Sequence, residues 1–243
     1  MFFNSVSKET MQSLKLTKYL DQNHMGSDCF IQALTHRSAN GKHNERMEFL
    51  GDSVLGLIIT SALYSKQPKA SEGYLSRLRA SLVNENTLAE IANELSLGDF
   101  LRLGAGELKS GGFRRKSILS DTLEAVIGSV YLEKGMDAAT DFVLKIYTNR
   151  LEKLPSEDDL KDPKSRLQEI LQSRGIDIPQ YKLVSTTGDA HRQIFTAECT
   201  IESLEVNTKG VAGSRRKAEQ QSAQNAYEIV KENFASKKKR KVK

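Results

Sequence analysis

The spacing of apolar residues along the chain changes once, close to residue 153. From Lys15 to Glu152 the apolar residues recur mostly at helical intervals, with Gly and Ser between the periodic stretches. No convincing alternating strand interrupts them, so this part predicts an all-α domain. The helices that we expect cover residues 28–38, 44–66, 72–95, 117–134 and 137–152.

A short acidic stretch, 153–162, is poor in apolar residues and is expected to be a linker. After it, Pro163 to Ser173 predicts a helix, with Pro in its first turn and Gly175 just past its end. Strand-like segments and an Ala-rich last helix then follow, near 180–186, 192–200, 203–211 and 214–231. The order α-β-β-β-α predicts a small α+β domain. We therefore expect an all-α domain over 1–152, the α+β domain over 163–232 and a tail over 233–243.

Composition and charge describe an ordinary soluble protein. Hydrophobic residues make up 38% of the 243 positions, and no uncharged apolar run is long enough to span a bilayer, so no membrane partner is expected. The net charge of +5 depends on the end of the chain, where six basic residues stand in the last seven positions and leave 30 basic against 31 acidic residues elsewhere. Any nucleic-acid-binding surface must therefore come from local clustering of basic residues. Two distant cysteines, Cys29 and Cys199, fit a reducing cytoplasm better than a disulfide framework.

Two groups of carboxylates stand within strongly apolar helices. Glu45, Glu48 and Asp52 are spaced i, i+3 and i+7, which places them on one stripe of a helix. Asp121 and Glu124 form a second pair at i, i+3. Like charges at these spacings repel unless a cation neutralises them, and hard oxygen ligands suit Mg²⁺. The pattern favours a carboxylate-held metal of the kind used in phosphoryl transfer, although solvated acidic helix faces would give the same spacing.

Basic residues open the last helix. Ser214 is a good N-cap, and Arg215, Arg216 and Lys217 follow it. Three cations at this end oppose the helix dipole, so an anion such as phosphate is expected to bind there. A solvated run of charges is the alternative.

Three motifs carry a resemblance to the ribonuclease III family. The string from Asn44 to Leu55 is similar to the family signature, with Met47 where Leu is more usual. The strings Ala33–Ser38 and Ser120–Gly128 resemble the flanking motifs, and the likeness covers nearly the whole chain in the family's order. The resemblance implies a helical endonuclease domain that is homodimeric and cuts double-stranded RNA with Mg²⁺, for which Mn²⁺ can substitute. It also implies 5′-phosphate and 3′-hydroxyl ends with short 3′ overhangs, and structured substrates such as ribosomal RNA precursors.

The resemblance also assigns roles to the acidic residues. Glu48, Asp121 and Glu124 match the metal ligands. Asp52 and Glu124 match the residues most essential to hydrolysis, with Asp52 holding or orienting the attacking water. Glu45 and Glu72 match two further acidic positions that border the catalytic valley.

Three segments of the C-terminal part resemble the three contact regions of a double-stranded-RNA-binding domain: Pro163–Gln172, Gly188–Arg192 and Gly213–Gln220. The match implies that Gln168, Glu169 and His191 face minor-groove sugars and base edges, and that the helix start binds phosphates through Ser214, Arg215, Arg216 and Lys217.

The remaining histidines carry no zinc-type pairing: we expect His36 to be a buried helical residue and His24 and His43 to lie at the surface. The basic tail is expected to be disordered and to add non-specific attraction to RNA, with a nuclear import signal as the alternative.

Two other functions remain open from the sequence. A non-catalytic RNA-binding or scaffolding protein could share the fold, although all six acidic positions are present. A DNA-directed metal nuclease fits the carboxylates equally well. It is disfavoured because an α-β-β-β-α module reads A-form geometry and 2′-hydroxyls.

Overall fold

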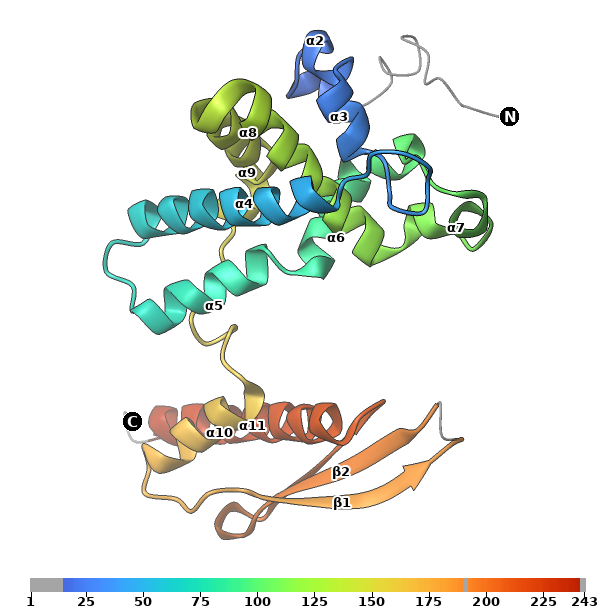
Figure 1. Cartoon of the computed structure of the whole chain (residues 1–243). Helices are drawn as coiled ribbons and strands as arrows, with labels where there is room; N and C mark the ends of the chain where they lie inside the picture. Colours follow the sequence, from blue (N-terminus) through green and yellow to red (C-terminus); the bar gives the residue numbers. More distant parts are fainter. Residues whose placement is uncertain (1–14, 190–191, 241–243) are drawn as a thin grey trace. The chain divides into compact units, whose positions relative to one another are not determined.

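The computed structural model describes residues 15–189 and 192–240, with side chains as far as residue 234, and divides the chain into two compact units, Met1–Pro155 and Ser156–Lys243. The first unit is helical (Figure 1). Its elements are η1 (Lys15–Lys18), α2 (Gln22–Met25), α3 (Asp28–Ala33), α4 (Glu45–Lys66), α5 (Glu72–Leu82), α6 (Glu85–Glu94), η2 (Leu97–Phe100), α7 (Ala105–Lys109), η3 (Gly112–Arg114), α8 (Lys116–Ile146) and α9 (Thr148–Glu152).

Helices α4 and α8 form the centre of this unit. Their facing sides bury Leu55, Ile59, Leu123 and Val126 completely or almost so, and burial of such side chains is the main favourable contribution to folding. Helix α8 breaks at Gly135, whose φ of 82° lies outside the helical region. The predicted gap between helices at 134 and 137 falls on this break.

Two of the predicted helices differ from those in the structure. The expected helix 72–95 is two helices, because Asn84 caps α6 by accepting a hydrogen bond from the backbone N–H of Thr87. The expected helix 28–38 ends at Ala33. Beyond it, the backbone N–H of Arg102 donates to the Leu34 carbonyl, and that of His36 donates to the Arg102 carbonyl. This pairing draws the chain out of the helix.

Helix α4 meets a length-and-hydropathy criterion for crossing a membrane. The core helix of a globular domain passes the same test. Helix α4 packs along α8 and carries the carboxylates of Glu48 and Asp52, so its apolar residues are explained by the domain core and by the exposed face described below.

The second unit has the predicted α-β-β-β-α order. Its elements are α10 (Pro163–Gln172), β1 (Gln180–Thr187), β2 (Ile194–Ile201), η4 (Glu202–Leu204), β3 (Val206–Ala212) and α11 (Arg215–Arg240). The strands form an antiparallel sheet in the order β1-β2-β3. The helices cover one face of the sheet (Figure 1), and the core between them includes Leu167, Cys199, Tyr227 and Val230.

Two bounds in this unit also differ from expectation. The third strand was expected from residue 203, but Glu202–Leu204 forms a short 3-10 turn and Glu205 has a φ of 53°. The last helix was expected to end at Lys231 and to give way to a disordered tail, yet α11 continues to Arg240. No Gly or Pro interrupts this segment. The guanidinium of Arg174, in the turn that follows α10, lies over the ring of Phe234 in α11. The last tail residues, 241–243, lie outside the described residues.

Candidate metal centre and nucleic-acid interface

The backbones of α4 and α8 touch where the two helices cross. Gly51 and Gly128 lie at this crossing. A Cβ atom on Gly51 would lie 1.8 Å from the carbonyl oxygen of Glu124, and one on Gly128 would lie 2.4 Å from the carbonyl oxygen of Met47. Only glycine leaves room for such an approach. The crossing therefore places the Glu48 turn of α4 beside the Glu124 turn of α8.

Three carboxylates meet at this crossing. Ligand oxygens of Glu48, Asp121 and Glu124 all lie within 4.8 Å of one another, and each residue is partly buried. We call these three residues the carboxylate cluster. Asp52, one turn after Glu48, is exposed and stands outside the cluster, although its charge acts on Glu124. The structure thus brings together the three residues expected to bind metal.

Burial and mutual repulsion make the cluster electrostatically unfavourable as it stands. Burial, followed by the charges of Asp52, Asp121 and Glu48, raises the pKa of Glu124 to about 8. Burial is also the main cause that raises the pKa values of Glu48 and Asp121. A carboxylate that is partly desolvated beside other carboxylates favours its neutral form, so the free protein holds a proton in this cluster near neutral pH.

The cluster fits a divalent cation. Its three ligands are hard carboxylate oxygens, which Mg²⁺ and Mn²⁺ prefer. A cation bound there would reverse the repulsion that raises these pKa values and would displace the shared proton. The three side chains are partly exposed, so solvent can reach the site.

The two supporting acidic residues lie outside the cluster. Glu45 at the start of α4 accepts a hydrogen bond from Arg37 at 3.1 Å and lies 3.6 Å from His43. Glu72 is exposed at the start of α5, as expected, and accepts a hydrogen bond from the Ser76 hydroxyl at 2.7 Å.

Sequence reasoning assigned no role to two charged residues near the cluster. Glu85, the first residue of α6, lies close enough for its charge to raise the pKa of Asp121. Arg37 lies close enough to lower the pKa values of both Glu48 and Asp121. Helical spacing could not find either residue, because each approaches the cluster from a different part of the chain.

The histidine expectations were wrong in two places. His36 is not a buried helical residue: it lies beyond α3 and shares a 2.8 Å hydrogen bond with the Ser38 hydroxyl. His24 is buried, not exposed, with Nδ1 on the Glu133 carboxylate and Nε2 3.2 Å from the Ser129 hydroxyl. The environment of His24 was missed because its partners lie more than 100 positions away in the sequence. That of His36 was missed because the residue and its partner lie on an irregular segment.

The predicted RNA-contact residues lie at two helix segments of the second unit. Gln168 and Glu169 are exposed on α10, where Glu169 accepts a hydrogen bond from Lys161 at 2.6 Å. At the start of α11, Ser214 caps the helix by accepting from the backbone N–H of Lys217 at 3.3 Å. His191 lies outside the described residues.

Glu219 reduces the positive charge at the start of α11. It pairs with Arg215 at 2.9 Å and with Lys164 of α10 at 2.8 Å, so it ties the two helices together. Arg216 and Lys217 remain exposed beside this pair. The cation excess at this helix end therefore rests chiefly on Arg216 and Lys217.

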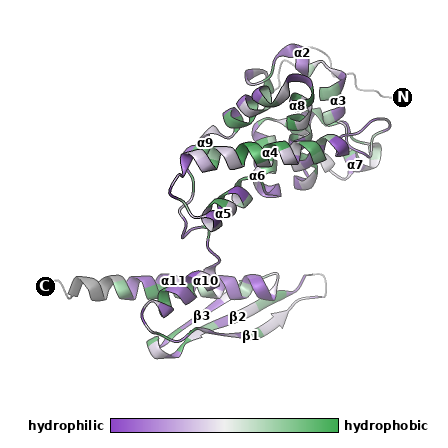
Figure 2. Cartoon of the chain, turned by 60° about the vertical axis from the view of Figure 1, so that its left-hand side comes forward, coloured by the Kyte–Doolittle hydropathy of each residue, from purple (hydrophilic) through white to green (hydrophobic). Residues whose placement is uncertain are grey.

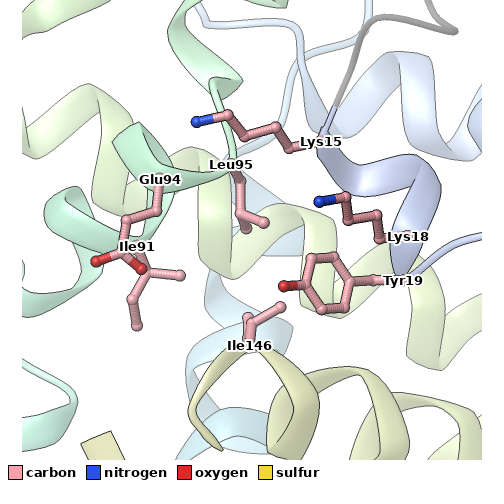
Figure 3. Close-up of a pocket in the computed structure, with 7 residues that line it drawn as sticks. All are labelled: Lys15, Lys18, Tyr19, Ile91, Glu94, Leu95 and Ile146. Atoms are coloured by element: carbon pink, nitrogen blue, oxygen red, sulfur yellow. The ribbon is translucent and has the colours of Figure 1, made fainter. Parts of the chain in front are cut away.

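A small cavity of about 90 Å³ lies elsewhere in the helical unit, between η1, α6 and α8 (Figure 3). None of the clustered carboxylates lines it, and it is too small for a nucleotide. Its lining residues are Lys15, Lys18, Tyr19, Ile91, Glu94, Leu95 and Ile146.

Comparison with known proteins identifies the family. The family model described as ribonuclease-III-like matches residues 27–151, and that of the double-stranded RNA binding motif matches residues 163–230. Ribonuclease 3 of Buchnera aphidicola subsp. Baizongia pistaciae is 53% identical over 87% of this chain and 94% of its own length. Ribonuclease 3 of Shewanella piezotolerans is 56% identical over 82% of this chain and 88% of its own length.

A solved structure supports the same assignment. The nuclease domain of ribonuclease III from Campylobacter jejuni is 41% identical to this chain, with a TM-score of 0.53. The match covers 61% of this chain and 99% of the Campylobacter chain. The chain belongs to the ribonuclease III family. It is a double-stranded-RNA endoribonuclease made of a helical nuclease domain and an RNA-binding domain.

Proposed function

We propose that the chain is a Mg²⁺-dependent homodimer that cuts both strands of duplex RNA in the cytoplasm, leaving 5′-phosphate and 3′-hydroxyl ends with short 3′ overhangs. The observation that carries the proposal is the carboxylate cluster at the α4–α8 crossing. Structured transcripts such as ribosomal RNA precursors are its expected substrates. Two free cysteines, Cys29 and Cys199, are compatible with a reducing compartment.

Glu48, Asp121 and Glu124 would hold the metal, which when bound supplies Lewis-acid polarisation of the phosphate and a more acidic water. Because burial keeps Glu124 protonated, this residue must lose its proton before it can act as a ligand. Asp52 is exposed beside Glu124 and would accept a hydrogen bond from the attacking water. Attack on phosphorus forms one P–O bond and breaks the bond to the 3′ oxygen, which leaves with a proton as a hydroxyl.

The outer face of α4 supports the dimer. Phe49, Leu57 and Tyr64 are 78%, 56% and 75% exposed, and their spacing places them on one side of the helix. Much of α4 is coloured as hydrophobic in Figure 2. An exposed apolar stripe on a core helix marks an interaction surface. A second copy fits because duplex RNA has an approximate two-fold axis, and the related Campylobacter domain is described as having a region involved in dimer formation.

The experiment that tests the function is incubation of the chain with a long perfect RNA duplex in Mg²⁺, Ca²⁺ or EDTA. We expect cutting in Mg²⁺ only, with short duplex products whose ends carry a 5′-phosphate and a 3′-hydroxyl. Binding without cutting under every condition would favour the scaffolding alternative, and equal cutting of DNA duplexes would contradict the RNA specificity.

Leu57→Asp is expected to convert the dimer into a monomer at micromolar concentration, because it places a charge in the apolar stripe. Light scattering measures the mass. Leu108→Asp is the matched control, since Leu108 of α7 is 54% exposed but lies off the stripe. Mixed dimers of one wild-type chain and one Glu124→Gln chain should nick one strand only. A dimeric Leu57→Asp variant, or double-strand cutting by mixed dimers, would contradict the proposal.

Arg216→Ala combined with Lys217→Ala is expected to weaken duplex binding alike for all sequences, because phosphate contacts carry no sequence information. Each lost contact should flatten the log–log dependence of affinity on salt by roughly 0.7 to 0.9. Binding titrations at several salt concentrations measure the slope. The control is Lys182→Ala with Lys209→Ala, which removes the same charge from exposed strand positions. An equal loss in both variants would show that only net charge matters.

A further inference from the structure

Arg37 lies on a short loop that is fixed on both sides by the segment 102–104. The backbone N–H of His36 donates to the Arg102 carbonyl at 3.0 Å. The backbone N–H of Gly104 donates to the Ser38 hydroxyl oxygen at 3.0 Å. A Cβ atom on Gly104 would lie 2.1 Å from the Ser38 carbonyl oxygen, so the two segments are in backbone contact. The loop around Arg37 is therefore held in place although it is irregular.

The side chain of Arg37 is open to solvent at this fixed point. It is 70% exposed, and its contact is a 3.1 Å ion pair with Glu45, which is 46% exposed. Exposed ion pairs of this kind contribute little to stability. Ordering a loop costs conformational entropy, and this pair does not explain why the loop is held so firmly. The pair can also exchange readily for a stronger partner.

The guanidinium stands beside the carboxylate cluster without occupying it. Its partner at 3.1 Å is Glu45, which precedes Glu48 by three residues in the first turn of α4, and its charge also lowers the pKa values of Glu48 and Asp121. An arginine that served to neutralise the metal ligands would pair with one of them. Pairing with Glu45 instead leaves the three ligand carboxylates available and holds a cation next to the place where the scissile phosphate must lie.

We propose that Arg37 is a substrate-positioning residue that binds the non-bridging oxygens of an RNA phosphate next to the scissile one, and that Glu45 holds it aligned until RNA arrives. Guanidinium geometry matches phosphate oxygens in a bidentate manner, which lysine cannot reproduce. The inference rests on the proposed function, because it takes the carboxylate cluster as the site of cutting. It assigns a contact to the helical domain in addition to those of the second domain.

Phosphate ethylation interference tests the contact without requiring cleavage. Glu124→Gln protein is mixed with ethylated RNA duplex, and bound and free RNA are compared with and without Arg37→Ala. We expect Arg37→Ala to remove the interference at one phosphate beside the cut position and to leave the rest unchanged. Arg46→Ala, which removes a neighbouring exposed arginine of α4, should keep that interference. An unchanged pattern in the Arg37→Ala protein would overturn the proposal.

Single-turnover cleavage gives the second readout. Arg37→Ala should lower the rate at saturating RNA by roughly 10- to 100-fold, the cost expected for losing a charged hydrogen bond that positions a reacting group. The defect should persist at every Mg²⁺ concentration, and Arg37→Lys should restore it in part. Full recovery at a different Mg²⁺ concentration, or an equal defect in Arg46→Ala, would mean that Arg37 acts only through the field at the cluster and would overturn the proposal. Failure of the wild-type protein to cut RNA would instead contradict the proposed function, while the interference pattern would still decide the role of Arg37.

Discussion

Glu124→Gln is expected to reduce cleavage of RNA duplexes by about a thousandfold or more while leaving duplex binding within about twofold of wild type. Glu124 is the most deeply buried of the three clustered carboxylates, and an amide cannot supply the negative charge that holds a divalent cation. Loss of several kcal/mol of metal stabilisation corresponds to that change in rate. The residues that we propose to contact RNA in the second unit lie on separate elements, so the affinity for duplex RNA should not change.

Single-turnover cleavage and binding titrations on the same duplex measure both quantities. Asp137→Asn is the matched control, because Asp137 is an exposed acid farther along α8, beyond the break at Gly135. The control should cut at the wild-type rate. Cutting by Glu124→Gln within a few fold of wild type would remove Glu124 from the metal site.

The same substitution should change how stability depends on pH in the metal-free protein. Burial raises the pKa of Glu124 from 4.5 to about 8, so between these values the folded state keeps a proton that the unfolded state loses. The free energy of unfolding therefore falls as pH rises through this window. Thermal unfolding in EDTA measures the difference in Tm between Glu124→Gln and wild type. At pH 8 the variant should have the higher Tm, and this advantage should be larger than at pH 5. A parallel pH dependence of the two proteins would contradict the raised pKa.

The part of the candidate site that helical spacing could predict is the grouping of carboxylates within each helix. The i, i+3 spacing of Asp121 and Glu124, and the i, i+4 spacing of Glu48 and Asp52, place each pair on one side of its own helix. That the two pairs face each other depends on which helices cross, and spacing within one helix carries no such information. The family resemblance implied that the two helices form one site, and the structure brings Glu48, Asp121 and Glu124 together.

The parts that sequence patterns missed depend on contacts between distant segments. The buried environment of His24 is formed by Ser129 and Glu133, which lie one turn apart on α8. The turn after α3 is set by backbone pairing with Arg102. The break after Leu82 could have been expected, because Asn84 followed by Glu85 is a helix-start signal inside an otherwise continuous apolar pattern.

The crossing of α4 and α8 shows most clearly why glycine positions matter to the site. Gly51 and Gly128 each face the backbone of the opposite helix, and this contact sets the separation of the two pairs of carboxylates. Neither glycine has a positive φ, so conformational freedom does not explain them. Each is required because a side chain there would push the helices apart.

Gly51→Ala is therefore expected to destabilise the helical unit by roughly 3 kcal/mol and to lower its Tm by about 10 °C. The added methyl group would meet the Glu124 carbonyl oxygen at 1.8 Å, and a backbone atom cannot move aside as a flexible side chain can. Where the variant still folds, the two helices must separate, which moves Glu48 away from Asp121 and Glu124. A displacement of about 1 Å at a reacting centre can reduce the rate by about a hundredfold, so Mg²⁺ binding and cleavage should both weaken.

Gly106→Ala provides the matched control for the alanine itself. Gly106 lies in α7, and a Cβ atom there would have no neighbour within 4 Å. Alanine favours a helix over glycine by about 1 kcal/mol, so this variant should be as stable as wild type or slightly more so. Circular dichroism melts give the stability, and calorimetric Mg²⁺ titration at a temperature where both variants are folded gives the affinity. If Gly51→Ala bound Mg²⁺ and cut RNA as Gly106→Ala does, the close approach at Gly51 would not be what assembles the cluster.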